Sequence, residues 1–449
     1  MKRLTLEATD ENVLASIKNN TYYRNSDVAE FVQAIDSIEG NMFISLNARW
    51  GEGKTFFVRQ VEKTLEYLTK KKVEFEHPDI TADLKPYFES TSLKDIELNS
   101  TYLPIYYNAW KYDNHDDPLM SLVFTIVKKA QVHLDATLNT SIGDKVKKLL
   151  SALSISANFG IVQGTVNGEN LINNLESKDV LANIKLAEDI HAMVKELINE
   201  AIAEKAQRLV IIVDELDRCR PTYAIEMLER IKHYFDDERI IFVSSINKQE
   251  LIHTISKYYG NGFDSSLYLN KFFDHTIQLP SLSEYAKQKM NSSYNSLQQR
   301  LNQTAKALTE YFNLSLRESI MLFGKISKVS TRYVNDEWAQ GRIMSVFVPL
   351  LMILDMKDEK EKIKFLNGES DILSDVFENV EILHRFAMTF GDKLYQEIYT
   401  EDNYTTGVKK IESVYKYVFG KNNSGWYEGN LDIDRELKQK CIEICNKSV

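Results

Sequence analysis

Residues 48–55, which read ARWGEGKT, contain the residue types of a phosphate-binding loop. A P-loop has a glycine, four further residues, and then Gly-Lys followed by Ser or Thr. Gly51 and Gly53 let main-chain amides approach a phosphate, and Lys54 places a positive charge where β- and γ-phosphate oxygens would lie. Thr55 would place its hydroxyl on Mg²⁺. We therefore predict that ATP with Mg²⁺ binds along this loop and the residue after it, through Arg49, Trp50, Gly51, Glu52, Gly53, Lys54, Thr55 and Phe56.

The loop departs from the pattern at one position, where Ala48 replaces the first glycine. Alanine adopts fewer backbone conformations than glycine, so some distortion of the loop is expected. We expect this departure to affect the rate of ATP hydrolysis more than the binding of ATP. An incidental turn is the alternative interpretation of the segment, and a strand before it with a helix after it would argue against that alternative.

Adjacent carboxylates end an apolar run in the segment VIIVDELDR, residues 210–218. Asp214 can hold Mg²⁺ through water, and Glu215 can polarise the water that attacks the γ-phosphate. The alternative for this pair is an ordinary solvated acidic turn. Because the loop and the carboxylates occur in this order on one chain, we predict that Thr55 and Asp214 bind the metal and that Lys54 and Glu215 are catalytic.

Two further residues are candidates for sensing the γ-phosphate. Asn247 ends the apolar segment RIIFVSSIN, and its amide can reach the γ-phosphate or the attacking water. Its alternative role is to cap a helix that begins near Lys248. Arg317, in LSLRE, can swing onto the γ-phosphate from a helical region, and its alternative is a solvated or salt-bridged helix arginine. We include Asn247 and Arg317 among the predicted catalytic residues.

Three other cations lie near these motifs in the sequence. Arg218 and Arg220 follow the carboxylates, where one can pair with Asp217 and the other can face a partner subunit. A structural role is favoured for Arg218. Lys271, in YLNKFF, is a weaker candidate for contact with the nucleotide of a neighbouring chain.

Apolar runs and helical periodicities place these residues on alternating strands and helices. The apolar segment at residues 41–47 leads into the loop, and a helix with one apolar face follows the loop. This alternation predicts an α/β fold with a parallel sheet and right-handed crossovers. The other predicted strands are 101–110, 208–214, 239–247 and 275–280, and the other predicted helices are one from a cap at Ser26 to a stop at Gly40, 118–131, about 179–205, and one that Pro221 opens.

Two domains are predicted along the chain. Residues 1–285 form the nucleotide-binding core, with a soluble insert at about residues 135–178, where spaced glycines favour a hairpin or mobile segment. Past about Ser281 we find helical periodicity and no strand, so residues 286–449 are predicted to be an all-helical C-terminal domain. The run IMSVFVPLLMIL at 343–354 is too short to span a bilayer and is interpreted as a buried helix.

Composition limits the compartment and the partners. The chain has 449 residues and is 43% hydrophobic, which supplies a sizeable core. Its net charge of −10 gives no help in attracting nucleic acid, although a local basic groove is compatible with that charge. Three cysteines argue against a disulfide framework, and the N-terminus has no apolar segment of signal-peptide length. We expect a cytoplasmic protein without membrane insertion.

Five segments, in order, resemble the KAP family of P-loop NTPases. They read ARWGEGKT, YYNAWKYD, VDELDRC, SSINKQEL, and YLNKFF with HTIQLP, and they cover roughly residues 22–320. The resemblance implies a RecA-like (ASCE) parallel sheet with helices on both faces and with the loop and carboxylate strands near its centre. It places Lys54, Thr55, Asp214 and Glu215 in the family's motif positions. Asn108, Trp110 and Tyr112 match a family strand motif, whose role we take to be packing beside the nucleotide.

The resemblance also implies a biological role. Bacterial members of the family resemble phage-exclusion and other defence components. The implied function is Mg²⁺-dependent ATP hydrolysis that drives a conformational or assembly change in bacterial anti-phage defence or stress signalling, with a second copy or another protein bound through the C-terminal helices. Two alternatives stay open: an ATP-gated switch or scaffold that recruits a partner without hydrolysis, and an ATPase stimulated by nucleic acid.

Overall fold

The computed structural model divides the chain into two compact units. One comprises Glu7–Pro280 and the other comprises the described residues of Ser281–Val449. The predicted domain boundary at residues 285–286 lies outside the described residues. The structure describes residues 7–73, 81–114, 117–133, 190–196, 198–199, 202, 206–260, 262–280, 296–329, 338–391, 401–420, 427–428, 431–432 and 436–447.

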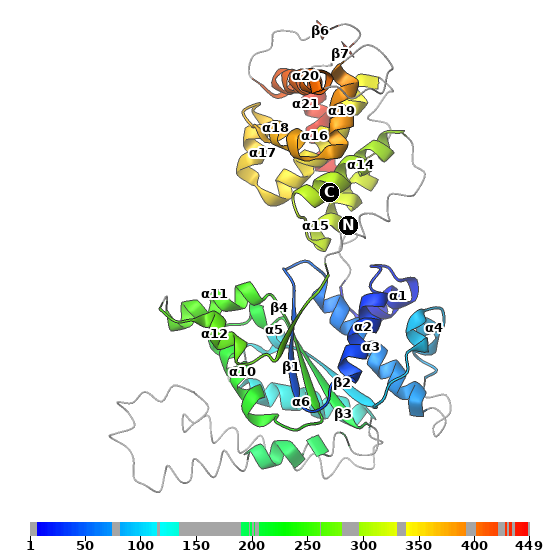
Figure 1. Cartoon of the computed structure of the whole chain (residues 1–449), viewed down its shortest axis with the longest axis vertical. Coiled ribbons are helices and arrows are strands. Elements are labelled where there is room, and N and C mark those ends of the chain that lie inside the picture. The colour runs from blue at the N-terminus through cyan, green and yellow to red at the C-terminus, as the bar shows by residue number, and fades with distance from the viewer. Residues whose placement is uncertain are drawn as a thin grey trace. The chain divides into compact units, whose positions relative to one another are not determined.

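A five-stranded parallel sheet forms the centre of the Glu7–Pro280 unit (Figure 1). Its strand order is β2-β3-β4-β1-β5, so β4 separates the strand before the loop from the strand before the carboxylates. The predicted α/β fold with a RecA-like sheet is confirmed. The strands are β1 (Met42–Asn47), β2 (Tyr102–Asn108), β3 (Arg208–Asp214), β4 (Ile240–Ile246) and β5 (His275–Gln278).

The strands that lead to the predicted site residues end at one edge of the sheet. Asp214 at the end of β3 lies opposite Asn108 of β2 on one side and Ser245 of β4 on the other. Asn47 at the end of β1 lies opposite Ile246 of β4. The carboxyl ends of parallel strands are where ligands bind in such sheets. The loop after β1 and the acidic turn after β3 therefore share this edge.

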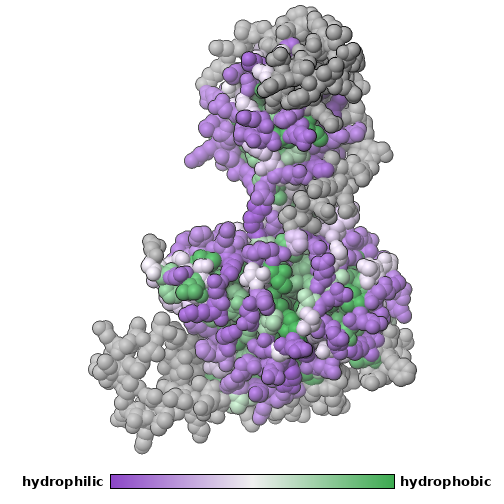
Figure 2. Space-filling model, viewed as in Figure 1, coloured by the Kyte–Doolittle hydropathy of each residue, from purple (hydrophilic) through white to green (hydrophobic). Residues whose placement is uncertain are grey.

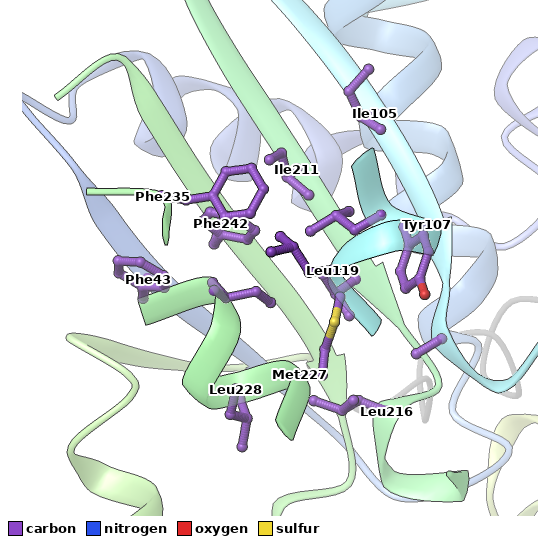
Figure 3. Close-up of a cluster of buried hydrophobic side chains, with 14 of the residues drawn as sticks. Phe43, Ile105, Tyr107, Leu119, Ile211, Leu216, Met227, Leu228, Phe235 and Phe242 are labelled. Atoms are coloured by element: carbon purple, nitrogen blue, oxygen red, sulfur yellow. The ribbon is translucent and has the colours of Figure 1, made fainter. Parts of the chain in front are cut away.

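Helices cover both faces of the sheet. One face packs against α1, α2 and α3, and the other packs against α6, α10 and α11. Successive strand residues point to opposite faces, so Ile211 enters one core and Ile212 the other. Figure 3 shows the core that contains Ile211, to which β4 contributes Phe242 and α10 contributes Met227. The helices and helical turns are α1 (Asp10–Asn19), α2 (Asn25–Asp36), α3 (Lys54–Val73), α4 (Lys85–Phe88), η1 (Ser92–Asp95), α5 (Ala109–Tyr112), α6 (Pro118–His133), η3 (Leu216–Arg218), α10 (Pro221–Tyr234), α11 (Lys248–Tyr259) and α12 (Ser265–Asn270).

The helix after the loop and the helix opened by Pro221 form as predicted, but the first predicted cap is wrong. α2 begins at Asn25, one residue before Ser26, and the side-chain oxygen of Asn20 accepts a hydrogen bond from the Asn25 amide at 3.2 Å. The helix ends at Asp36, ahead of Gly40. Gly40 instead takes a φ of 80° immediately before β1. Arg24 stands at the cap position without a side-chain cap bond, and Asn20 of the preceding turn satisfies the amide of the first helical residue.

Two predicted segments lie wholly or partly outside the residues that the structure describes. Residues 134–189 lie outside the described residues, and they contain the predicted insert at about 135–178. Of the helix predicted at about 179–205, the described residues 190–196, 198–199 and 202 are helical. Four of these are buried in the same core as α6 and α10: Ile190, Val194, Ile198 and Ile202.

The end of the Glu7–Pro280 unit is bonded to the residue that precedes α2. Arg24 is only 3% exposed, and its Nη2 donates a hydrogen bond to the carbonyl oxygen of Pro280 at 2.7 Å. Its Nη1 pairs with Asp27 at 2.7 Å. The chain therefore leaves this unit from a fixed point.

Helices also build the core of the second unit. The apolar run at 343–354 is buried within α16, as predicted. One detail of the all-helical prediction is wrong, because two short strands pair antiparallel through Tyr427–Asp432 and Glu428–Leu431. These strands have two residues each, which is too few to show a periodicity. The elements are α14 (Ser296–Tyr311), α15 (Leu316–Ser327), α16 (Trp338–Lys357), α17 (Glu359–Leu366), α18 (Ile372–Asn379), α19 (Glu381–Gly391), α20 (Glu401–Phe419), β6 (Tyr427–Glu428), β7 (Leu431–Asp432) and α21 (Leu437–Lys447).

Apolar side chains reach the surface over α11 and α12. Figure 2 shows hydrophobic residues there, and Leu267 is 61% exposed while Tyr258 is 42% exposed. Exposed apolar residues of this kind are ordinary on a protein surface. Within the described part of the chain, no helix combines the length and the apolar character needed to cross a membrane.

Candidate nucleotide-binding site

The loop between β1 and α3 has the backbone of a phosphate cradle. Gly51 and Gly53 have φ angles of 87° and 82°, which side-chain-bearing residues rarely adopt. α3 begins at Lys54, so the first amides of a 20-residue helix open towards the loop. These amides, together with the helix dipole, favour an anion at this point. The predicted order of strand, loop and helix is therefore present.

Ala48 fits its position without strain. Its amide donates to the carbonyl oxygen of Ile246 at 3.2 Å, which extends the pairing of β1 with β4 by one residue. It is not among the residues with positive φ. The distortion expected from replacing glycine here is wrong, because a β-carbon is compatible with this extended backbone.

Lys54 is turned back into its own loop. Its Nζ donates hydrogen bonds to the carbonyl oxygens of Ala48 at 2.6 Å and Arg49 at 3.2 Å. The residue is 9% exposed, and burial lowers the pKa of Lys54, while the nearby charges of Asp217 and Asp214 oppose that shift. The ammonium group is thus held at the loop by acceptors that a phosphate group could replace.

The remaining predicted loop residues have structural contacts. The indole Nε1 of Trp50 donates to Asp217 Oδ2 at 2.5 Å, which links the loop to the acidic turn. Arg49 pairs with Glu52 at 3.2 Å within the loop. Phe56 packs its ring edge-on against Tyr22, with 5.2 Å between ring centroids.

Asp214 is a buried carboxylate held by several hydrogen-bond donors. It is 1% exposed. The Tyr106 hydroxyl donates to its Oδ2 at 3.0 Å, and the Glu215 amide donates to its Oδ1 at 3.0 Å. Burial raises the pKa of Asp214, and hydrogen bonds from Thr55 and Tyr106 and the charge of Lys54 act in the opposite direction. The structure therefore brings Lys54, Thr55 and Asp214 together.

Glu215 has an unusual backbone and a paired side chain. Its φ of 62° and ψ of 25° are left-handed, a conformation rare for residues other than glycine. Its Oε1 pairs with Arg218 Nη1 at 2.8 Å, and its Oε2 accepts from Asn108 Nδ2 at 3.4 Å. Burial raises the pKa of Glu215, and the Arg218 charge lowers it. The carboxylate is directed by these two partners.

The contacts of Arg218 differ from those expected. Arg218 pairs with Glu215, not with Asp217, because Asp217 receives the indole of Trp50. The Arg218 guanidinium carbon also lies 5.6 Å from the ring centroid of Trp110. Trp110 itself is 53% exposed, so it does not pack in the interior.

Asn108 and Tyr112, the other two residues singled out in the segment YYNAWKYD, make different contacts. Asn108 both bonds Glu215 and accepts the Lys111 amide at 2.9 Å as the cap of α5. Tyr112 stacks on Tyr107 with 5.3 Å between centroids. Tyr112 thus packs on a neighbouring ring, whereas Asn108 and Trp110 do not, and packing of these residues beside a nucleotide stays a prediction.

Asn247 occupies the N-cap position just before α11, but it does not cap that helix with its side chain. Instead the Asn47 Oδ1 accepts the amide of Lys248 at 2.8 Å. Asn47 also donates to Gln278 Oε1 at 2.9 Å, so it joins the ends of β1, β5 and α11. Asn247 is 8% exposed at the same edge of the sheet as Asp214. Its side-chain amide is therefore not used by the alternative role considered for it.

The remaining candidate cations have other surroundings within their own units. Arg317 is exposed in the first turn of α15, in the Ser281–Val449 unit. Lys271 is exposed at the end of α12. Arg220 bonds the backbone carbonyl of Asp113 through its side chain, and its own amide donates to Asp113 Oδ2 at 3.2 Å.

The donor atoms at this edge fit Mg²⁺. Mg²⁺ prefers hard oxygen ligands and is commonly held by one or two protein oxygens together with phosphate oxygens and water. The Thr55 hydroxyl and the Asp214 carboxylate supply such oxygens at the start of α3 and the end of β3. The chemistry of the residues present is thus compatible with a magnesium-nucleotide complex.

Three residues with direct roles at this edge were not predicted as site residues: Tyr106, Asn47 and Asp217. Tyr106 precedes Asn108 by two residues on β2, and strand residues two apart share a face. Asn47 is a polar residue at the end of an apolar strand that enters the loop. Both signals were present in the sequence, whereas the bond between Trp50 and Asp217 joins residues 167 apart and depends on the folded sheet.

Comparisons with known proteins agree with this geometry. A relative from Methanocaldococcus jannaschii, an uncharacterized protein, is 27% identical over 165 residues, which covers 30% of this chain and 84% of that relative. The model of the KAP family P-loop domain matches residues 24–364, a range that contains the loop, the acidic turn and part of the second unit. This chain belongs to the KAP family of P-loop domain proteins.

Proposed function

We propose that this protein binds ATP with Mg²⁺ and hydrolyses it at the edge of the sheet where β1 and β3 end. One observation carries the proposal. The cradle of Gly51 and Gly53 leads directly to Lys54 and Thr55, and both of these interact with the buried carboxylate of Asp214. A cationic, amide-lined loop beside an acidic strand end is the arrangement that handles a nucleoside triphosphate and its metal.

Each residue has a proposed task in this reaction. The main-chain amides from Gly51 to Thr55 bind the β-phosphate, and Lys54 leaves its two carbonyl partners to neutralise charge on the γ-phosphate. Thr55 and Asp214 hold Mg²⁺. When bound, Mg²⁺ neutralises phosphate charge as the γ-phosphate is transferred. Glu215 orients the water that attacks in line, and Asn247 lies ready to contact that water or the γ-phosphate.

The ion pair of Glu215 with Arg218 gives the second candidate function a physical basis. A carboxylate that is bonded to a guanidinium at 2.8 Å is less free to act as a base. ATP binding could then lock a conformation or an assembly with little turnover, and the protein would act as a switch.

Substitution of Glu215 by Gln tests the choice between enzyme and switch. Glutamine keeps the shape of the side chain but cannot accept a proton, so we expect steady-state phosphate release to fall by about 10²–10⁴-fold. ATP binding, measured by calorimetry, is expected to be retained. Glu238→Gln is the matched control, because Glu238 is exposed and precedes β4 at the opposite edge of the sheet. If the wild type releases phosphate no faster than Glu215→Gln, hydrolysis is excluded and the switch is favoured.

The proposal extends to how hydrolysis is used. ATP turnover would drive a conformational or assembly change, with Arg317 reporting the nucleotide state from α15 and with a second copy or another protein bound through the helices of the Ser281–Val449 unit. The proposed setting is the bacterial cytoplasm, in anti-phage defence or stress signalling. Support for this setting comes from the family resemblance and from the few cysteines of the chain.

A further inference from the structure

Tyr106 is the residue that the proposed reaction has not yet used although it contacts the proposed metal ligand. It lies on β2, in the strand next to that of Asp214. Its hydroxyl donates to Asp214 Oδ2 at 3.0 Å from the neighbouring strand β2, while Ser245 of β4 interacts with Asp214 from the other side. The Glu215 amide bonds the other oxygen, Oδ1, at 3.0 Å. These two bonds, one on each oxygen, restrain rotation of the carboxylate.

Burial makes the Tyr106 hydroxyl hard to replace. Asp214 is 1% exposed, so bulk water has little access to the oxygen that Tyr106 serves. A buried carboxylate oxygen that loses its donor carries the full cost of its desolvation. The side chain can reduce that cost by rotating, and rotation would move its metal-binding oxygen.

The ring of Tyr106 is held in turn by the phosphate-binding helix. Arg59 of α3 places its guanidinium carbon 4.5 Å from the centroid of the Tyr106 ring. Arg59 is itself ion-paired with Glu62 and Asp10 and has a side chain that is 12% exposed. Since α3 begins at Lys54, the helix that carries the phosphate-binding lysine also holds the ring that orients Asp214.

We propose that Tyr106 is a positioning residue for Mg²⁺, because its hydroxyl holds the Asp214 carboxylate in the orientation that the metal of the bound nucleotide requires. The proposal rests on the proposed function, since it concerns the metal of that same site. Partners that orient a metal ligand typically contribute 10–100-fold to metal affinity. Removal of the hydroxyl should therefore lower the affinity of the ATP-bound site for Mg²⁺, while the contacts of the protein with the nucleotide itself stay unchanged.

Tyr106→Phe tests this role, and Tyr107→Phe is the matched control. Tyr107 is the next residue of β2, is buried where Tyr106 is half-buried, and loses a hydroxyl bonded to Ser121 and Tyr223 in the opposite core. ATP affinity of each full-length variant is measured by calorimetry in EDTA and across a Mg²⁺ titration. For Tyr106→Phe we expect the Mg²⁺ concentration that gives half of the Mg²⁺-dependent gain in affinity to rise about 10-fold, with the affinity in EDTA unchanged. For Tyr107→Phe we expect both quantities to match the wild type.

A second variant covers the case in which Tyr106→Phe does not fold. Arg59→Lys keeps a positive charge for Glu62 and Asp10 but removes the planar guanidinium from the ring of Tyr106. A loosened ring should raise the Mg²⁺ requirement in the same direction by a smaller factor. Phosphate release at saturating Mg²⁺ is expected to return towards the wild-type value in both variants, because Asp214 is still present.

The outcomes separate this inference from the function on which it rests. A Mg²⁺ titration of Tyr106→Phe that overlays the wild type would overturn the positioning role. Equal losses of affinity with and without Mg²⁺ would also overturn it, since they would show a general structural effect. If the wild type itself shows no Mg²⁺-dependent gain in ATP affinity, the proposed function fails before the variants are compared.

Discussion

Trp50 connects the two loops that would contact opposite sides of the triphosphate. Its indole donates to Asp217, a carboxylate of the acidic turn that is 5% exposed. Trp50 is 46% exposed, so its ring contributes little to the core, and its main contribution is this hydrogen bond. The bond fixes the distance between the phosphate loop and the turn that carries Glu215.

Replacing Trp50 by Phe should loosen this connection. The change leaves a buried carboxylate without its indole donor, so we expect the free energy of unfolding to fall by about 1–3 kcal/mol. We also expect ATP to bind several-fold more weakly, because the loop would be less preorganised. Urea titration and calorimetry measure the two effects.

Trp110→Phe is the control, since Trp110 is exposed and phenylalanine can still lie under the Arg218 guanidinium. Equal behaviour of the two variants would contradict the role assigned to Trp50.

At the scale of elements, a side chain at the end of one strand accepts a hydrogen bond from the first amide of a helix that is distant in sequence. Asn47 closes β1, accepts the Lys248 amide of α11, and bonds Gln278 at the end of β5. It therefore does the work of a helix cap from another element, and Asn247 stands at the cap position with a side chain that makes no cap bond. Because Asn47 bonds the Lys248 amide, the Asn247 side chain is available for the proposed contact with the nucleotide.

Substitutions of Asn47 and Asn247 test these two roles. Loss of a helix-capping side chain typically costs about 1 kcal/mol, so Asn47→Ala should lower the free energy of unfolding by about that amount. Asn247→Ala should change it by less, and should instead reduce phosphate release at saturating ATP. Chemical denaturation and phosphate-release assays on both variants check this. The assignment is wrong if Asn247→Ala is the more destabilising of the two.

Local patterns in the sequence were sufficient to predict most elements but not their caps or their cross-element bonds. The apolar run before Asp214 and the glycine pattern around Lys54 predicted a strand and a loop, because both depend on neighbouring residues. Ser26 was a wrong cap, because the structure uses the Asn20 side chain for the Asn25 amide. The strand face that Tyr106 shares with Asn108 could be predicted from β2, but its bond to Asp214 could not, because that bond depends on which strands are adjacent in the sheet.

At the scale of the whole molecule, each unit has its own hydrophobic core. The clusters on the two faces of the sheet consist entirely of residues between Val13 and Leu279. The cluster of the second unit consists of residues between Leu301 and Ile444. Neither unit therefore depends on the other for its buried apolar surface, in the described part of the chain.

A chain that ends at Pro280 should accordingly fold by itself. We expect it to unfold cooperatively and to bind ATP with Mg²⁺ within about threefold of the full chain, since a domain with its own core can fold alone. Thermal unfolding and calorimetry measure both properties, with Lys54→Ala in the short chain as the control for specific binding. An aggregated or unfolded short chain would contradict the independence of this unit. Phosphate release by the short chain would also show how much the second unit, including Arg317, contributes.

The bond from Arg24 to Pro280 makes the exit of the chain from this unit a mechanical anchor. A pull on the segment that follows Pro280 would act on a buried guanidinium at the start of α2, and α2 packs in the same core as α3. The load would thus pass to α2 and, through the core that the two helices share, to α3, which begins at Lys54. Tension on the chain beyond residue 280 would therefore displace the phosphate loop. A shift of that loop would in turn displace the segment that is joined to Pro280.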